Sequence, residues 1–270
     1  NRLFINQAGK GFQDQAVEQG LAFKGASLMM AFSDYDRDGD LDGYLLTNRI
    51  PPGEELKDVR FRLVKGPDGE PVILPEEMQQ YAGLIKSPSG YKQIASGQFD
   101  RLYRNEGGKF VEVGKEAGVR ESEYGLSATW WDYDADGWPD LYVANDFYGA
   151  DHLYRNKGDG TFEDVAPRAL PHTPWFSMGS DVADINNDGL FDYMASDMAG
   201  SDHYKEKMSM GNMTGKESDS WFLNWPIPAQ YMRNAVYLNT GTGRFNEIAF
   251  QTGLAATDWT WAIKFGDLDC

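Results

Sequence analysis

The sequence is poor in cysteine, in positive charge and in long hydrophobic runs. Its one cysteine among 270 residues is Cys270, so an internal disulfide is excluded. Lysine and arginine number 25 against 42 acidic residues, and the formal net charge of −17 argues against nucleic acid or an anionic membrane as partner. We find no transmembrane segment and no signal peptide, although a processed N-terminus before Asn1 would hide a targeting segment.

What the chain does contain points to β-structure. Hydrophobic residues make up 41% of the sequence and aromatic residues 14%, which is enough to build a core. The 30 glycines favour many tight turns. We therefore expect an all-β protein.

The most informative feature is an acidic nine-residue motif that recurs. It reads DYDRDGDLD at 34–42, DYDADGWPD at 132–140 and DINNDGLFD at 184–192, and a fourth copy begins at Asp267 and Asp269. Oxygen-bearing side chains at positions 1, 3, 5 and 9, with glycine at position 6, match the needs of a hard cation such as Ca²⁺, which takes six to eight oxygen ligands. We predict three complete calcium sites and a truncated fourth.

These loops differ from an EF-hand. The EF-hand loop ends with a glutamate at position 12 and lies between two helices, whereas position 12 is here Leu45, Val143 or Ala195. The flanking residues are β-formers, so we expect strand–loop–strand sites. The candidate ligands, with position 7 included, are Asp34, Asp36, Asp38, Asp40, Asp42, Asp132, Asp134, Asp136, Trp138, Asp140, Asp184, Asn186, Asp188, Leu190, Asp192, Asp267 and Asp269.

A second motif recurs at a nearly constant distance before the first. An alternating strand, a glycine turn and a short second strand start at Asn1, Asp100, Asp151 and Asn234, and the next acidic loop follows 33, 32, 33 and 33 residues later. Each copy has the signature of a β-hairpin. A strand-rich repeat of this length predicts a β-propeller of four-stranded blades.

The phase of the two motifs assigns the strands. One blade would comprise 126–131, 141–144, 152–155 and 162–165, with the acidic loop between its first two strands. The chain would then hold about three complete blades and two partial ones. We expect residues 1–270 to be a fragment of a longer propeller.

Two insertions interrupt the regular spacing. The loop-to-hairpin distance is 11 residues from Asp140 to Asp151, but 58 from Asp42 to Asp100 and 42 from Asp192 to Asn234. The insertions lie at about 49–99 and 199–233, and the first contains a candidate short helix at 74–81. Long insertions on a rigid scaffold often carry binding; the alternative is that they only cap the propeller.

The motifs resemble a known family. The segment 131–145 and the Leu-Tyr-Arg-Asn hairpins resemble FG-GAP/VCBS repeats, the calcium-bearing blades of integrin α-subunit propellers. The stretches 196–211, 230–234 and 257–261 are similar to bacterial members of the cartilage acidic protein family, which also carry an ASPIC/UnbV domain that is absent here. The resemblance implies a secreted or surface-exposed propeller of seven or eight blades with calcium in its blades. Asn186 departs from the pattern, and it should weaken the third site.

Three functions fit these features. The first is an extracellular calcium-binding scaffold for adhesion to a protein or glycan, since weak loop sites suit the near-millimolar calcium outside cells. The second is a structural subunit that self-assembles at the surface. The third is a polysaccharide-active enzyme, because some polysaccharide lyases use calcium on similar propellers.

The residues argue against an enzyme. GxSxG, HExxH and a phosphate-binding glycine loop are absent from the sequence. Of the three histidines, we expect His152 to be a surface variant and His172 a turn residue, and His203 has the best functional context. The tryptophans allow a carbohydrate platform, but we expect core packing for most of them and exposure for Trp138; they are Trp130, Trp131, Trp138, Trp259 and Trp261.

Overall fold

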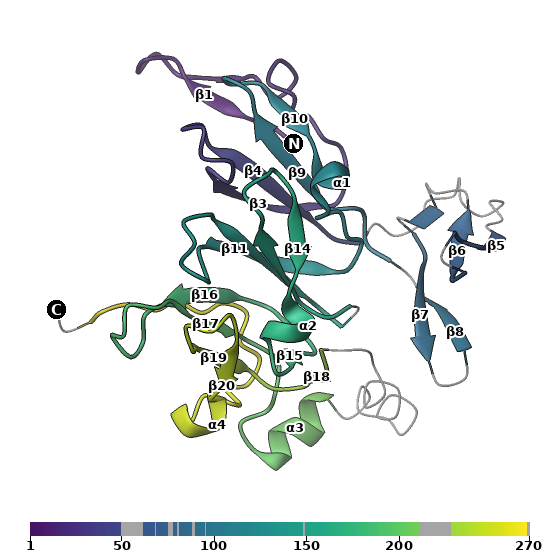
Figure 1. Cartoon of the computed structure of the whole chain (residues 1–270), viewed down its shortest axis with the longest axis vertical. Helices are drawn as coiled ribbons and strands as arrows, with labels where there is room; N and C mark the ends of the chain where they lie inside the picture. The colour runs from purple at the N-terminus through teal and green to yellow at the C-terminus, as the bar shows by residue number, and fades with distance from the viewer. Residues whose placement is uncertain are drawn as a thin grey trace.

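The computed structural model describes residues 1–49, 62–67, 69–74, 78–79, 81–87, 90–94, 96–147, 149–210 and 228–268. These residues form β-strands in several antiparallel sheets, joined by a few short helices (Figure 1). The expected all-β class is confirmed.

Three four-stranded antiparallel sheets follow one another along the chain. Their strands are ordered as the repeats predict, and the first two strands of each flank an acidic loop. Sheet 1 consists of β3 (Ser27–Ser33), β4 (Asp42–Thr47), β9 (Arg101–Asn105) and β10 (Phe110–Glu112). Sheet 2 consists of β11 (Gly125–Trp131), β12 (Asp140–Asn145), β13 (His152–Asn156) and β14 (Phe162–Asp164). Sheet 3 consists of β16 (Ser180–Ala183), β17 (Asp192–Ala195), β19 (Ala235–Asn239) and β20 (Phe245–Glu247).

The sheets pack face to face, and sheet 2 lies in the middle (Figure 1). Every residue of β12 is buried. Its side chains alternate between the two faces of the sheet, and each face is covered by a neighbouring sheet. Leu141 and Val143 join the core shared with sheet 1, and Tyr142 and Ala144 join the core shared with sheet 3. The middle sheet therefore has no solvent face at its second strand.

Single-turn helices close the hairpins. They are α1 (Gly114–Ala117), α2 (Ala166–Ala169) and α4 (Ala249–Thr252), each of which follows the fourth strand of its sheet. Gly118 and Gly253 end α1 and α4 in the left-handed conformation, with φ of 79° and 76°, which glycine adopts without steric cost. The first hairpin of the chain, β1 (Phe4–Asn6) with β2 (Phe12–Asp14), forms a separate two-stranded sheet.

The described parts of the insertions carry their own structure. The first contains two antiparallel hairpins, β5 (Arg62–Lys65) with β6 (Pro71–Leu74) and β7 (Gly83–Ser87) with β8 (Gly90–Ile94), which stand beside the three sheets (Figure 1). The expected helix at 74–81 is wrong at its start, because Leu74 ends a strand; residues 75–77 and 80 lie outside the described residues. The second contains α3 (His203–Met210).

Two short strands connect the end of the second insertion to the segment between sheets 2 and 3. β15 (Thr173–Pro174) pairs in parallel with β18 (Gln230–Tyr231). No helix among the described residues has the length and apolarity needed to cross a bilayer.

Candidate metal centre

The acidic segments 34–42, 132–140 and 184–192, named loops 1, 2 and 3, share one backbone conformation. The residue at position 4 is left-handed in each, with φ of 61° at Arg37, 57° at Ala135 and 59° at Asn187. The glycine at position 6 also has a positive φ in each loop. Because positions 4 to 6 contain two residues with positive φ, glycine at position 6 limits the strain of the turn.

The loops also share one hydrogen-bond scheme. In loop 2, the Asp132 carboxylate accepts a 2.8 Å bond from Gly137 N–H, and the Asp136 carboxylate accepts a 3.0 Å bond from Trp138 N–H. The same pairs in loops 1 and 3 lie 2.8 to 3.1 Å apart. These bonds curl the loop so that its side-chain oxygens face a common centre.

The aspartate at position 9 is the buried anchor of each loop. The two oxygens of Asp140 accept bonds from Tyr133 N–H at 3.0 Å and from Asn156 N–H at 2.7 Å. Asp42 and Asp192 make the equivalent pairs of bonds. Burial raises the pKa of Asp140 to about 8 and that of Asp42 to about 6, against these hydrogen bonds, which lower both. A neighbouring cation would offset this cost of burying charge.

The free oxygens of the loops fit a hard cation. Single carboxylate oxygens of Asp34, Asp36 and Asp42, at positions 1, 3 and 9, lie within 4.8 Å of one another in loop 1, and those at positions 1, 3 and 5 do so in loop 2. Asp34 Oδ1 and Asp134 Oδ1 are buried and have no hydrogen-bond partner within the described structure. Such orphaned acceptors are costly unless something pairs with them. The donor set, all oxygen and mostly anionic, is the one that Ca²⁺ prefers.

The three loops are not electrostatically equal. In loop 2, Arg155 contacts Asp134 at 2.5 Å and Asp136 at 2.7 Å, so a guanidinium offsets two of the carboxylates. Loop 3 has Leu238 at the matching strand position. There the Asn186 amide donates a 2.9 Å bond to Asp188. Loop 3 therefore has one carboxylate fewer and no paired arginine.

The remaining predicted ligands are placed as follows. The position-7 residues Asp40, Trp138 and Leu190 donate their amide N–H groups to the position-5 carboxylates. Asp38 and Asp188 are exposed at position 5, and Asp184 is half-buried at position 1. Asp267 is exposed at the end of the described chain, and Asp269 lies outside the described residues.

Sequence reasoning missed the structural role of the asparagine that ends each hairpin strand. The side-chain amide of Asn156 donates a 3.0 Å bond to Pro139 O, and its backbone N–H holds the position-9 aspartate. Asn105 and Asn239 bond in the same way to Leu41 O and Phe191 O. The sequence did contain a signal for this role, because asparagine ends the first strand of every repeated hairpin, at Asn6, Asn105, Asn156 and Asn239.

Two of the three histidines differ from expectation. His152 is no plain surface variant, since its side chain is 16% exposed and lies against Asp164 and Glu123. His172 is not an exposed turn residue, because it is 3% exposed and its ring meets Tyr231 edge-on at 5.2 Å. His203 begins α3 and is exposed.

The tryptophans divide between core and surface. Trp131 is 7% exposed, and its ring stacks on Tyr193 of sheet 3 at 5.1 Å, which confirms its core role. Trp130 packs in the core between sheets 1 and 2. Trp138 is half-buried under Arg37, with the guanidinium carbon 5.3 Å from the ring centre. Trp259 and Trp261 are exposed.

Comparison with known proteins supports the repeat. Residues 132–195, which run from loop 2 through loop 3 to the end of β17, match the family model described as FG-GAP-like repeat. No curated protein matches the chain in sequence. A solved structure of an Agrocybe aegerita lectin, described as recognising non-reducing terminal N-acetylglucosamine, is similar at 12% identity, covering 91% of this chain and 72% of that one. Its TM-score of 0.27 is too low to carry an argument about this chain.

Proposed function

We propose that this chain is a calcium-stabilised part of a β-propeller that acts outside the cell as a binding scaffold for a protein or glycan. The observation that carries the proposal is the repetition of one loop geometry three times, each time between the first two strands of a four-stranded sheet. Repetition of the backbone conformation and of the hydrogen bonds together is expected when each loop serves the same ion.

The calcium would be held by the side chains at positions 1, 3, 5 and 9. Its chemistry is structural: it neutralises carboxylates that lie too close together and fixes the turn between two strands. Loop sites of this kind bind calcium at the concentrations found outside cells. This is why we assign the protein to the cell surface or the extracellular medium.

The binding role is supported by the way in which the insertions are displayed. The β5–β6 and β7–β8 hairpins of the first insertion stand away from the stacked sheets in Figure 1, and α3 lies in the second insertion. Irregular segments on a rigid β-scaffold are common places for recognition. The finer resemblance, to the ASPIC/UnbV-associated cartilage acidic proteins with seven or eight blades, belongs to the same proposal.

A calcium titration of the chelator-stripped protein tests the calcium part. Calorimetry should show about three sites per chain, and the unfolding temperature should rise with calcium, because a ligand that binds only the folded state stabilises it. Absence of binding to a protein whose circular dichroism shows folded β-structure would overturn the proposal.

The scaffold role is tested separately on the calcium-loaded chain. A glycan array and a panel of immobilised extracellular matrix proteins should give saturable binding that chelation abolishes. Saturable binding that survives chelation would separate recognition from the calcium sites. A stable calcium-loaded chain that binds no member of either panel, but forms concentration-dependent oligomers in ultracentrifugation, would replace the scaffold by a self-assembling subunit.

A further inference from the structure

A second group of ligand atoms lies away from the acidic loops. Glu121 and Glu123 are in the segment between α1 and β11, and His152 is the first residue of β13. One carboxylate oxygen of each glutamate and a ring nitrogen of His152 lie within 4.8 Å of one another. His152 Nε2 is 3.9 Å from Glu123 Oε2. The group combines nitrogen and oxygen donors, unlike the all-oxygen loops.

The imidazole of His152 is held in one orientation. Its Nδ1 donates to Asp164 Oδ2 at 2.9 Å, and its ring stacks on Tyr154 with centroids 5.1 Å apart. Nε2 is buried and has no hydrogen-bond partner among the described residues. A carboxylate on one ring nitrogen and a free second nitrogen is the arrangement that histidine adopts when it binds a metal.

The glutamate segment is also fixed by its backbone. Gly97 N–H donates a 2.6 Å bond to Ser122 O, and Asp100 N–H donates a 2.9 Å bond to Glu121 O. Ser122 N–H bonds to Glu123 Oε2 at 3.0 Å. Gly149, at φ +82°, approaches so closely that a Cβ there would lie 2.0 Å from Glu123 Cγ. The donor atoms are therefore placed before any ligand arrives.

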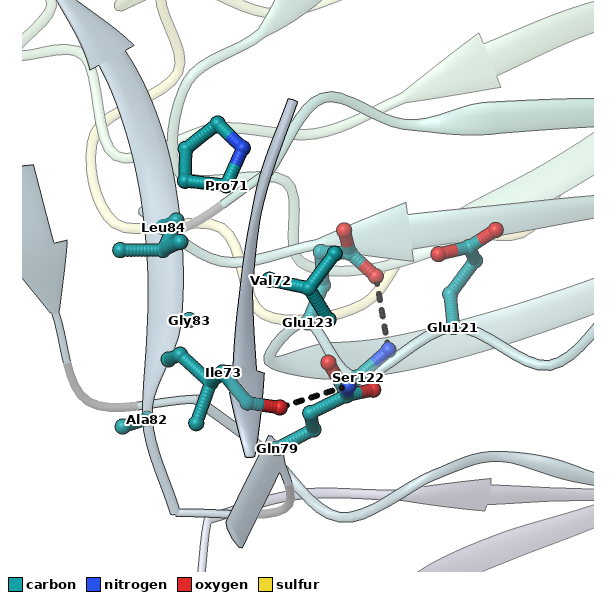
Figure 2. A pocket seen from close by; sticks show the side chains of 10 residues that line it. All are labelled: Pro71, Val72, Ile73, Gln79, Ala82, Gly83, Leu84, Glu121, Ser122 and Glu123. Carbon is teal, nitrogen blue, oxygen red and sulfur yellow. Dashed lines mark hydrogen bonds between the residues drawn. The ribbon is translucent and has the colours of Figure 1, made fainter. Parts of the chain in front are cut away.

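A cavity opens beside the two glutamates. It has a volume of about 280 Å³ and lies between the 121–123 segment and the first insertion. Figure 2 shows Glu121, Ser122 and Glu123 along one wall, and Val72, Ile73 and Leu84 along the other. The two glutamates thus line the cavity opposite an apolar wall, whereas His152 is not among its lining residues.

The charges around the group favour a cation. Glu121, Glu123 and Asp164 bring three carboxylates around the single imidazole of His152. A metal ion would supply positive charge at this concentration of carboxylates.

We propose that Glu121, Glu123 and His152 bind one divalent transition-metal ion, with Zn²⁺ as the best match, and leave a coordination position open to the cavity. An imidazole among the donors favours such a metal over calcium. Bond lengths of about 2.0 to 2.2 Å place two ligand atoms of a tetrahedral Zn²⁺ roughly 3.4 Å apart. The 3.9 Å between His152 Nε2 and Glu123 Oε2 needs only a small rotamer adjustment. This proposal does not depend on the calcium sites.

Zinc titration of the whole chain tests the site. The calorimeter sample contains near-millimolar calcium, so that calcium and not zinc occupies the acidic loops. Calorimetry should give one Zn²⁺ site per chain, and His152→Ala or Glu123→Gln should weaken it at least about 100-fold. Asp164→Asn, which loosens the imidazole without removing a ligand, should weaken it about 10- to 100-fold.

Matched controls separate this site from chance binding. His203→Ala removes an exposed histidine and should bind zinc like the parent chain. Glu123→Gln keeps the side-chain shape, and an unchanged circular dichroism spectrum shows that it folds. Zinc should also raise the unfolding temperature of the parent chain but not that of Glu123→Gln. A parent chain that binds no zinc, or variants that bind it equally well, would overturn the proposal.

Discussion

The side-chain amide of Asn156 donates a 2.8 Å hydrogen bond to the backbone carbonyl of Tyr35, which lies 121 residues earlier in the chain. Asn156 ends the third strand of sheet 2, and Tyr35 is position 2 of loop 1. Asn239 of sheet 3 bonds to Tyr133 O of loop 2 in the same way, also at 2.8 Å. Loops 1 and 2 are therefore each attached to the sheet that follows, and loop geometry and sheet packing are coupled there.

Replacing Asn156 by alanine should lower stability. The change leaves the carbonyls of Tyr35 and Pro139 without their donor in a buried place, and a lost buried hydrogen bond costs about 1 to 3 kcal/mol. Urea unfolding in calcium should show a loss in this range. Asn246→Ala, at an exposed position of β20, is the control and should stay within about 0.5 kcal/mol of the parent. Equal losses in the two variants would contradict the inter-sheet role.

Asp136→Ala should lower stability only when calcium is present. Asp136 is an exposed candidate ligand at position 5, and without an ion it makes surface contacts that contribute little. At a calcium concentration about 100 times the dissociation constant, loss of one site costs about 2.7 kcal/mol. Thermal unfolding with calcium and with chelator measures the difference. Asp159→Ala removes an exposed aspartate outside the loops that accepts two bonds from Thr161, and it should change stability by the same amount in both buffers. Similar losses with and without calcium would show that Asp136 is no ligand.

Arg155→Leu should tighten calcium binding at loop 2. The guanidinium pairs with Asp134 and Asp136, and it competes with a cation for these oxygens. Leucine is the residue that sheet 3 has at the matching position, Leu238, so the strand should accept it. Calorimetry should show one of the calcium sites with higher affinity. Arg168→Leu, which breaks an exposed ion pair with Glu163, is the control and should leave all sites unchanged. A weaker loop 2 site in Arg155→Leu would mean that the arginine orients the ligands.

Trp131→Ala should be among the most destabilising single changes. The indole lies between sheets 2 and 3, stacked on Tyr193 with an interplanar angle of 4°. Removing a large buried aromatic side chain leaves a cavity and costs about 3 to 5 kcal/mol. Trp261→Ala, which truncates a side chain that is 63% exposed, should cost far less. Chemical denaturation of both variants in calcium makes the comparison, and similar losses would argue against an inter-sheet core at Trp131.

His172 should make the protein sensitive to mild acid. Burial, with the nearby Arg233, lowers its pKa from 6.5 to about 4. Between these values the unfolded chain binds more protons, so the stabilisation is complete above about pH 6.5 and is lost as the pH falls towards 4, by up to about 1.4 kcal/mol per pH unit. His172→Phe keeps an aromatic ring beside Tyr231 but cannot titrate. The difference in unfolding free energy between parent and variant should follow this slope, and parallel pH curves would exclude it.

The repeated sheets were predictable because each strand and loop is written in a contiguous motif. Glycine at position 6 and the aspartates around it specify the turn, and the unbroken apolar run at 141–144 is typical of a strand buried on both faces. Phase between the motifs was then enough to order the strands. The burial of the position-9 aspartates Asp42, Asp140 and Asp192 was not predicted. It could have been, because each is the first residue of the buried second strand of its sheet.

The group at Glu121, Glu123 and His152 could not be predicted. Its members come from a connecting segment and from a strand start, and Asp164 comes from a third place, so no spacing in the sequence links them. His152 occupies the position that is Arg2, Arg101 or Ala235 in the other hairpins, and a position in a repeat says nothing about a neighbour that only one repeat has. Sequence patterns specify what every repeat shares, whereas this group belongs to sheet 2 alone.

The attachment of loops 1 and 2 to the following sheets has a direction. In both cases the amide donor lies in the later repeat and the carbonyl acceptor in the earlier one, so the middle unit has a donor, Asn156, at one interface and an acceptor, Tyr133 O, at the other. A unit copied by gene duplication would therefore contain both the amide donor and the carbonyl acceptor of this contact. It could be added to a stack of such units without a new kind of interface. The same polarity fixes the order in which the units can be stacked, since a reversed unit would bring two donors or two acceptors together.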